Sequence, residues 1–412
     1  EALLTFRAHI NPFGEIEFDL DKIALTDQNS FIPDHLCSFG DFSLSGKAED
    51  GTELFIDKLS FNSEGDLDDI NLSISRCPEA RFIRKLEKPT QAIRRWLKGF
   101  RSDPTRPLIQ ECQLGTIVIG ECHYDDPNEI SGFIKLEINE EKFDSVIWHE
   151  QANKLLDHVL GVMHFATGKM FKTPIIENYT GKTLEIMVLS QIAENQVSDI
   201  PVCSFIDRQS IFNTAVASFF NPPFPVNNIM SAIEWFVIDS SIYEVRLIHA
   251  FTALENIIAS NLEKSENGKL ILPAKDFEKK YLPILRRVVK KCVEKWSIGD
   301  SDQKKNELEK INEKLIELNR RSLKENLELL ANCWSVSLQG INNNQIKAAV
   351  NARNLIVHEG SYNETDSNVK MEHFWVIREI VIRFIFTAIG YQGNYISHLG
   401  EFHTSQYPQK SL

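Results

Sequence analysis

Arg353, Asn354 and His358 lie close together in the segment NARNLIVHEG, residues 351–360. A histidine side chain gains and loses its proton near neutral pH, so it can act as a general acid or base. An arginine side chain stays protonated and offers a planar fork of N–H donors to anionic oxygens. The amide of Asn354 can orient either group. These residue types therefore suit proton transfer beside a phosphate group.

The spacing of apolar residues predicts a helix over residues 343–358, which would position all three side chains. Its apolar residues fall on one arc: Ile346, Ala349, Val350, Ile356 and Val357. Arg353 lies inside that arc, where an unpaired charge is costly to bury. We therefore expect Arg353 to pair with a carboxylate, to extend into water or to lie at an interface.

Asn351, Asn354 and His358 form a second stripe on this helix, at positions i, i+3 and i+7. Arg353 and His358, in contrast, are about 140° apart around the helix axis. One helix does not direct both side chains at the same point, whereas two copies related by a two-fold axis could do so. A histidine near a helix end is also a common cap or surface residue, so the spacing leaves a structural role open.

Glu255 is a candidate partner for Arg353. It lies in the segment IHAFTALENIIAS, residues 248–260, on the same side of the expected helix as Phe251 and Ile258. A carboxylate on this side is at least partly buried and needs a partner. Two interpretations stay open. Glu255 pairs with Arg353 or another cation of the site and holds it in place, or it forms a salt bridge inside a helical bundle without any part in catalysis.

The first third of the chain has the alternating pattern of β-strands, broken by turn-rich segments. The expected strands span residues 14–20, 42–46, 52–61, 70–76, 115–121, 132–138 and 182–189. Residues 87–103, with the basic and aromatic run AIRRWLKGFR, are expected to form a surface helix or an irregular excursion. Residues 146–168 have helical spacing and end at Gly168. The pattern predicts an antiparallel sheet, either a sandwich or a curved sheet.

The rest of the chain has helical periodicity. The expected helices span residues 228–241, 242–264, 278–296, 303–334, 343–360 and 369–390. The sequence thus predicts an α+β fold with a β-rich region over residues 1–205, an all-α helical bundle over residues 206–395 and a tail over residues 396–412.

The chain has 412 residues, which predicts two or three domains, and a formal net charge of -13. An acidic chain does not hold nucleic acid by bulk attraction, because phosphate contacts rely on clustered Lys and Arg. A local RNA track is conceivable in the segment LRRVVKKCVEKW, where Arg287, Lys291 and Lys295 share a helix face. We favour the alternative, a solvated face balanced by the glutamate-rich helix at 307–328.

The sequence does not support a metal site, a disulfide framework, a membrane span or secretion. The seven cysteines are scattered and the histidines form no ligand cluster, so we expect neither a metal site nor a disulfide framework. No apolar stretch approaches the length of a membrane span. The first residues do not have the pattern of a secretory signal. We therefore expect a cytoplasmic protein without a membrane partner.

The string R-N-x-x-x-H at Arg353–His358, on a late helix of an α-helical bundle, resembles the signature of HEPN domains. The segment IHAFTALENIIAS resembles the early HEPN helix of the ApeA-like branch. The β-rich region ahead of the bundle is also similar to the N-terminal region of that branch. The resemblance is specific over residues 230–390 and rests on layout alone over residues 1–205.

The resemblance implies a metal-independent endoribonuclease without a cofactor, of the kind used in antiphage defence or abortive infection. It implies His358 as the acid or base, Arg353 at the phosphate and Asn354 beside them, with Glu255 and Asn351 in support. RNA would be the substrate, with tRNA as one candidate. HEPN domains pair to build their site, so a homodimer or a higher homo-oligomer is expected.

An alternative follows from the same resemblance, because HEPN domains without activity serve as dimerisation or binding modules. For the nuclease, constant activity would be toxic to its own cell, so control is expected. We therefore expect the β-rich N-terminal region to sense a trigger, such as a phage-derived molecule, or to restrain the bundle.

Overall fold

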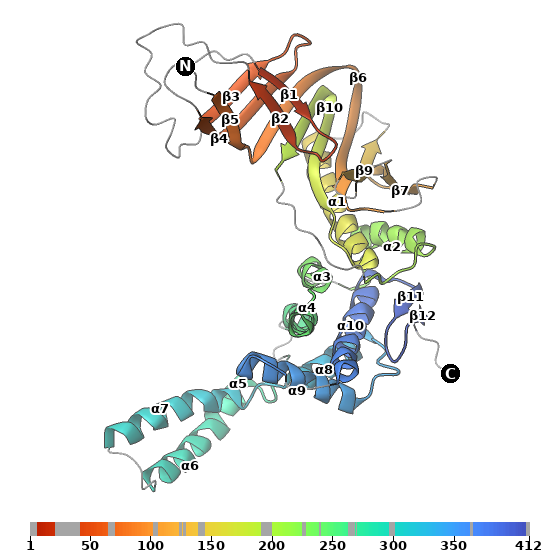
Figure 1. The fold of residues 1–412 in the computed structure, drawn as a ribbon. Helices are drawn as coiled ribbons and strands as arrows, with labels where there is room; N and C mark the ends of the chain where they lie inside the picture. The colour runs from red at the N-terminus through yellow and green to blue at the C-terminus, as the bar shows by residue number, and fades with distance from the viewer. Residues whose placement is uncertain are drawn as a thin grey trace. The chain divides into compact units, whose positions relative to one another are not determined.

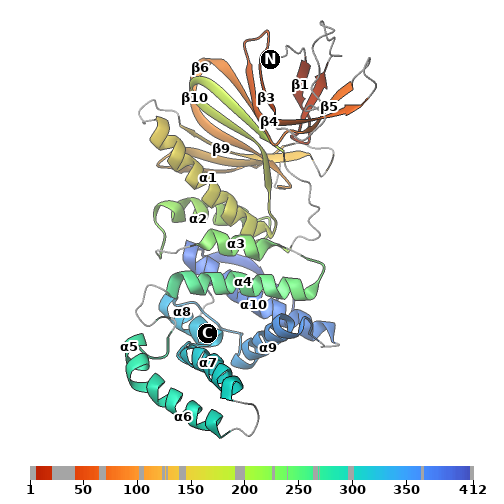
Figure 2. The same ribbon diagram turned by 90° about the vertical axis from the view of Figure 1, so that its left-hand side faces the viewer.

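The computed structural model describes residues 6–20, 42–64, 71–101, 106–122, 126, 129–138, 145–190, 200–224, 228–238, 240–262, 268, 270–295, 301–362 and 366–408. The chain divides into an N-terminal unit, Glu1–Asn221, and a C-terminal unit, Pro222–Leu412 (Figures 1 and 2). The division falls after helix α2 (Arg208–Phe220) rather than near residue 205. The reason is that α2 packs against helix α1 (Ser145–Thr167) and strand β7 (Leu108–Cys112).

The N-terminal unit is built on an antiparallel sheet and the C-terminal unit is helical, which together confirm the predicted α+β fold class. The main sheet runs in the order β3 (Phe42–Lys47), β4 (Glu53–Glu64), β6 (Glu79–Lys98), β9 (Ile130–Ile138), β8 (Gly115–Glu121) and β7. Strand β10 (Lys172–Leu189) pairs with β6, and β5 (Asn71–Arg76) pairs with β4. Strands β1 (Phe6–Ile10) and β2 (Ile16–Leu20) form a separate hairpin. Helix α1 packs on one face of the sheet against β6 and β9 (Figure 2).

The prediction of a helix or an irregular excursion at residues 87–103 is wrong, because residues up to Lys98 belong to strand β6. Ile93, Arg95 and Leu97 are buried, whereas Arg94 and Trp96 between them are half-buried, which is the period of two of a strand. The apolar residues of this run fit helical spacing as well. The run forms a strand because it pairs with β10 on one side and with β9 on the other.

Helix α1 carries two half-buried histidines, His158 and His164. The His158 Nε2 atom is 3.0 Å from the Ser218 Oγ atom, and the His164 Nε2 atom is buried without a hydrogen-bond partner among the described residues. The His164 ring packs against Phe171 with 4.8 Å between ring centroids. Burial disfavours the charged imidazole and lowers the pKa of each histidine to about 4.

These two histidines predict a loss of stability in mild acid. The unfolded chain takes up both protons below about pH 6.5, whereas the folded protein resists protonation down to a pKa of about 4. Their contribution to the free energy of unfolding is therefore fully present above that unfolded pKa and declines as the pH falls. At about pH 5 we expect a loss of about 2 kcal/mol for each imidazole.

Urea unfolding at about pH 7.5 and about pH 5 measures this loss. His164→Phe, which keeps an aromatic ring beside Phe171, should remove roughly half of the pH dependence. A variant with the same pH dependence as the unchanged chain would contradict the assignment.

The C-terminal unit is helical, with one short hairpin at its end. Its elements are α3 (Ile229–Val237), α4 (Tyr243–Leu262), α5 (Ala274–Asp276), a π-helical turn η2 (Phe277–Tyr281), α6 (Leu282–Glu294), α7 (Ser301–Glu317), α8 (Leu323–Trp334), α9 (Asn343–Glu359), α10 (Ser367–Ile389), β11 (Gly393–Ser397) and β12 (His403–Tyr407). Helices α3, α4, α9 and α10 pack on one another, and α6 and α7 form a helical hairpin of their own.

Two boundaries of this unit differ from the sequence prediction. The expected helix over residues 303–334 is two helices, because Ser322 caps the start of α8 in a capping box with Glu325. The expected tail over residues 396–412 contains part of β11 and all of β12, which pair as an antiparallel hairpin.

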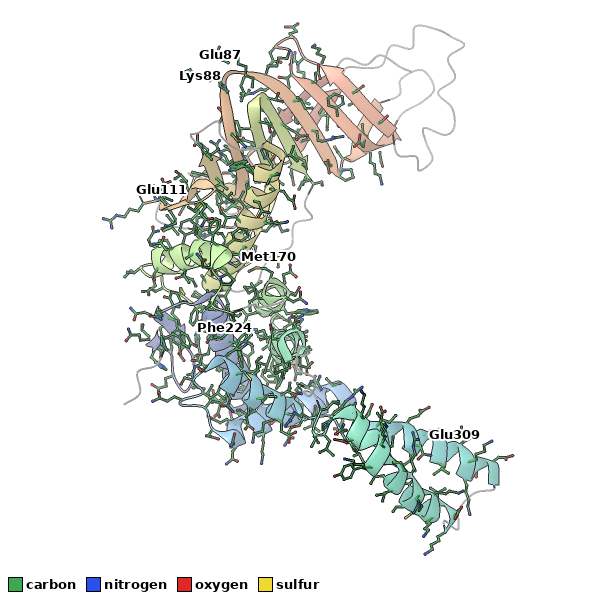
Figure 3. The ribbon with its side chains drawn as sticks, turned by 180° about the vertical axis from the view of Figure 1, so that it is seen from behind. Glu87, Lys88, Glu111, Met170, Phe224 and Glu309 are labelled. Atoms are coloured by element: carbon green, nitrogen blue, oxygen red, sulfur yellow. The ribbon has the colours of Figure 1, made fainter. Side chains whose placement is uncertain are left out.

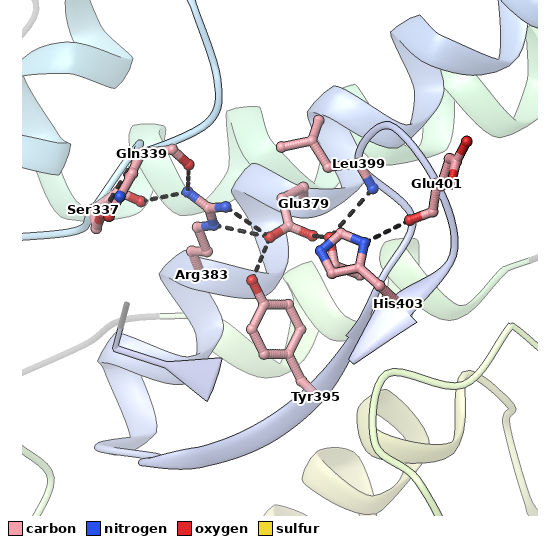
Figure 4. A network of polar contacts seen from close by, with 9 residues as sticks. Ser337, Gln339, Glu379, Arg383, Tyr395, Leu399, Glu401 and His403 are labelled. Atoms are coloured by element: carbon pink, nitrogen blue, oxygen red, sulfur yellow. Dashed lines mark hydrogen bonds and ion pairs between the residues drawn. The ribbon is translucent and has the colours of Figure 1, made fainter. Parts of the chain in front are cut away.

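A buried ion pair lies in the middle of α10. The Arg383 Nη2 atom is 2.9 Å from the Glu379 Oε1 atom, and the two side chains are 1% and 2% exposed. The Arg383 Nη1 atom donates to the carbonyl oxygens of Ser337 and Gln339, at 2.9 Å and 2.8 Å. These carbonyls lie in the loop that leads into α9, so the ion pair ties α10 to the start of that helix (Figure 4).

The same carboxylate also holds the terminal hairpin. The Tyr395 hydroxyl donates to Glu379 Oε1 at 2.5 Å, and the Ser397 hydroxyl donates to Glu379 Oε2 at 3.0 Å (Figure 4). Burial and the nearby Glu379 raise the pKa of Tyr395 well above its usual value. Glu379 is thus satisfied by donors from two elements, as a buried carboxylate must be.

Candidate functional site on helix α9

Helix α9 carries the residues that the sequence singled out, and both of its ends are capped. The Asn342 side chain accepts hydrogen bonds from the backbone N–H groups of Asn344 and Gln345. Gly360 ends the helix in the left-handed conformation, with a φ of 75°, which a glycine adopts at no cost. These caps fix the bounds of α9.

The buried face of α9 is shorter than predicted. Ile346, Ala349 and Ala352 are buried, whereas Leu355 is 37% exposed and Val357 is 51% exposed. The expected apolar arc therefore holds for the first part of the helix only. Its last turns present apolar side chains to solvent.

Arg353 pairs with Glu255 of helix α4. The Arg353 Nη2 atom is 2.9 Å from the Glu255 Oε1 atom, with the side chains 28% and 38% exposed. The Arg353 Nη1 atom donates to the Asn354 Oδ1 atom at 3.2 Å. Arg353 is therefore the cation that Glu255 contacts, and this contact is compatible with both interpretations of Glu255. A partly exposed pair of this kind contributes about 0–1 kcal/mol to stability, so its main effect is to hold the guanidinium in place.

The paired guanidinium still has donors to offer. A guanidinium has five N–H groups in all, and the two contacts of Arg353 use one N–H each on Nη1 and Nη2. The remaining N–H groups can meet the oxygens of an anion. Arg353 is therefore held by Glu255 and Asn354 while it keeps the capacity to bind phosphate.

His358 lies in the last turn of α9 and is exposed, as are Asn351 and Asn354. Within the described part of the chain its side chain makes no hydrogen bond or ion pair. Along the axis, His358 lies about 7.5 Å beyond Arg353 and about 140° around it. The single chain thus brings Arg353, Asn354 and Glu255 together but does not bring His358 to the Arg353 guanidinium.

The basic residues of α6 lie away from these groups. Arg287, Lys291 and Lys295 are exposed, and no ion pair joins them to the glutamates of α7 in the residues that the structure describes. The two helices meet through Leu282 and Leu315, whereas the Glu309 side chain points away from α6 (Figure 3). The balance of charge that we favoured from the sequence is therefore not made by direct contacts.

The sequence analysis missed one polar cluster, because residues 87–103 were expected to form a helix or an irregular excursion and no strand was expected between residues 168 and 182. Glu177 of β10 lies beside Arg94 and Trp96 of β6, and it also accepts a hydrogen bond from Tyr179. A sequence pattern could have indicated this cluster. Arg94 and Trp96, and likewise Glu177 and Tyr179, are two residues apart, which places each pair on one face of its strand.

Comparisons with protein-family models, with curated proteins and with solved structures gave no match. In the described ranges, no helix combines the length and the hydrophobicity that crossing a membrane requires. No group of three or more histidine, cysteine, aspartate or glutamate side chains in these ranges is placed to hold a metal ion.

Proposed function

We propose that the protein is a HEPN-type endoribonuclease that cuts host or phage RNA without a metal, in the cytoplasm, as part of antiphage defence or abortive infection. The observation that carries the proposal is the Arg353–Glu255 ion pair. It holds an arginine beside Asn354 on the helix that also carries an exposed His358. This is the set that anion stabilisation and proton transfer need.

The proposed reaction is a transesterification within the RNA. The ribose 2′-oxygen attacks the adjacent phosphorus and loses its proton, and the bond from phosphorus to the 5′-oxygen breaks. The products are a 2′,3′-cyclic phosphate and a 5′-hydroxyl. His358 takes or gives the proton, and Arg353 stabilises the negative charge that builds on the phosphate oxygens. Asn354 orients the guanidinium, and Asn351 extends the polar stripe toward the RNA.

The active form in this proposal is a homodimer. Arg353 and His358 point to different sides of α9, so one site takes its arginine from one copy and its histidine from the other. Leu355 and Val357 are exposed next to these residues, and apolar side chains of this kind are covered when a second copy packs there. Arg287, Lys291 and Lys295 add a weaker basic track for the RNA strand.

A second candidate function is a non-catalytic dimerisation or binding module. The exposed Leu355 and Val357 favour it equally well, because they serve an interface whether or not chemistry follows. Expression in cells separates the two functions. If the unchanged protein is toxic to the cells and the His358→Ala variant is harmless, the result supports the nuclease. If both proteins are equally toxic, the result favours the binding module.

The direct test is RNA cleavage in EDTA, with total tRNA and a structured RNA as substrates and with the fragment ends mapped. Cyclic-phosphate ends from the unchanged chain and none from His358→Ala would support the proposal. Cleavage that disappears with EDTA and returns with a divalent cation would contradict it. Candidate triggers of the N-terminal unit are added in a parallel arm, because control of the nuclease is part of the proposal.

Glu255→Gln tests the supporting role of the ion pair. The variant keeps an oxygen acceptor but removes the charge that restrains Arg353, so we expect cleavage to slow by roughly tenfold. The midpoint of thermal unfolding should hardly change, because the pair is partly exposed. The measurement is the single-turnover cleavage rate beside a melting curve.

Glu244→Gln is the matched control, because Glu244 lies on the same helix α4. It forms a comparable half-buried ion pair with Lys370, at 3.6 Å and with 29% and 23% exposed side chains. It should cleave RNA at the unchanged rate. If both glutamine variants lose the same activity, Glu255 has no special role in the site.

A further inference from the structure

The hairpin of helices α6 and α7 is closed at its base by Asn319, which is 4% exposed. The Leu272 N–H donates to the Asn319 Oδ1 atom at 2.8 Å, and the Asn319 Nδ2 atom donates to the Leu272 carbonyl oxygen at 2.9 Å. The hairpin has a small core of its own, built on Phe277, Leu282 and Leu315. Within the C-terminal unit it extends away from α10 (Figures 1 and 2). It is therefore a closed body with a large exposed surface.

Helix α6 has two apolar faces, and only one of them is covered. The covered face joins the core shared with α7 through Leu282, Leu285 and Val289. The other face carries Tyr281, Ile284 and Val288, which are 47%, 57% and 54% exposed. Their positions i, i+3 and i+7 place them in one stripe along the helix. A surface helix usually presents polar side chains to water, so this stripe is available for a contact outside the chain.

Basic side chains run beside the exposed stripe. Residues 274–295 contain eight lysines and arginines and three acidic residues, a formal charge of +5 in a chain of -13. Arg287 follows Ile284 by three residues and Lys291 follows Val288 by three, so each pair is adjacent on the helix surface. Lys295 continues the basic row by one more turn. All three cations are exposed, and within the described residues none of them forms an ion pair.

The combination of charge and apolar surface selects among anionic partners. RNA is held by cations and by stacking on aromatic rings, and it gives an aliphatic stripe little to pack against. An anionic bilayer surface offers phosphates to the cations and an acyl boundary to Ile284 and Val288. Because the whole chain is acidic, this local excess of positive charge sets the part of the hairpin that can approach such a surface.

We propose that the exposed face of α6 binds an anionic lipid surface. Ile284 and Val288 enter the boundary between headgroups and acyl chains, and Arg287, Lys291 and Lys295 contact the lipid phosphates. The helix lies in the plane of the interface. The expectation of no membrane partner rested on the lack of a spanning stretch, and surface binding needs none. The proposal does not rest on RNA cleavage, because lipid binding is measured without RNA.

Sedimentation of the whole chain with lipid vesicles tests the proposal. One set of vesicles contains about 30% phosphatidylserine in phosphatidylcholine, and the other contains phosphatidylcholine alone. We expect the anionic vesicles to bind at least about tenfold more tightly, and we expect binding to weaken as the salt rises from about 0.1 M to about 0.5 M. No binding to the anionic vesicles would overturn the proposal.

Two variants separate the apolar contribution from the charge. Ile284→Gln removes an exposed apolar side chain and should weaken vesicle binding about tenfold. Lys291→Gln removes one cation and should weaken it about fivefold. The matched controls are Ile316→Gln and Lys305→Gln on α7, where Ile316 is 49% exposed and Lys305 is also exposed. Equal losses in the controls and in the α6 variants would contradict a site on α6.

Two other occupants of this face predict different results. For RNA, tRNA binding in a His358→Ala background should weaken with Lys291→Gln and stay unchanged with Ile284→Gln, while vesicles bind neither protein. For a second copy of the chain, Ile284→Gln should lower the molecular mass in solution, measured by light scattering. Either result would overturn the lipid assignment. A mass unaffected by Ile284→Gln, together with the vesicle losses above, supports it.

Discussion

His358→Ala is expected to cleave RNA about 10²–10⁴-fold more slowly than the unchanged chain, the usual effect of losing a general acid or base. The melting curve should stay the same, because the side chain is exposed at the end of α9. His403→Ala is the matched control, an exposed histidine of the same unit in β12. Equal cleavage by His358→Ala and the unchanged chain would remove His358 from the mechanism.

Arg353→Ala should cause a loss of similar size, and Arg353→Lys should recover little of it. A lysine keeps the charge but lacks the planar fork that can contact Glu255 and a phosphate at once. The same variants test where the site is assembled. If one copy supplies the arginine and the other the histidine, each mixed dimer of Arg353→Ala and His358→Ala contains one complete site.

Mixing the two inactive variants should therefore restore a substantial part of the cleavage. The measurement is the cleavage rate against the mixing ratio, with a maximum at equal amounts. Variants that stay inactive at every ratio, while mixed dimers are shown to form, would place Arg353 and His358 in the same copy's site.

The second large effect is expected for the buried ion pair between Arg383 and Glu379 of α10. Arg383→Met should lower the free energy of unfolding by about 3–5 kcal/mol, because Glu379 is then left as a buried carboxylate without its cation. The carbonyl oxygens of Ser337 and Gln339 also lose their donor. Urea or thermal unfolding of the whole chain measures the loss.

Lys324→Met is the control for this change. Lys324 and Glu328 also form an i,i+4 ion pair, at 3.4 Å, but their side chains are 22% and 39% exposed. Its removal should cost less than about 1 kcal/mol. Similar costs for Arg383→Met and Lys324→Met would mean that burial adds nothing to the α10 pair.

Local rules predicted helix α9 and gave Glu255 as one candidate partner of Arg353. Gly360 marks the end of the helix, and pairing with a carboxylate is the outcome that the structure shows among those expected for an arginine within an apolar arc. The arc itself was predicted too long, because burial depends on which neighbours pack against a helix as well as on its own spacing. Val357 fits the arc by position and is exposed all the same.

Longer-range contacts explain the other errors. The run around Trp96 fits a helix by spacing, and its place between β9 and β10 makes it a strand. That pairing also brings Glu177 to Arg94 across a long sequence separation, so their ion pair could not be predicted from either segment alone. The break before α8 was readable in principle, because Ser322 and Glu325 have the spacing of a capping box.

Glu379 and Arg383 join strand β11 to the loop that starts α9. A change that displaces Tyr395 or Ser397 removes a donor from the carboxylate that also holds Arg383. Because Arg383 donates to the carbonyl oxygens of Ser337 and Gln339, substitutions in β11 are expected to affect the start of α9 as well as stability.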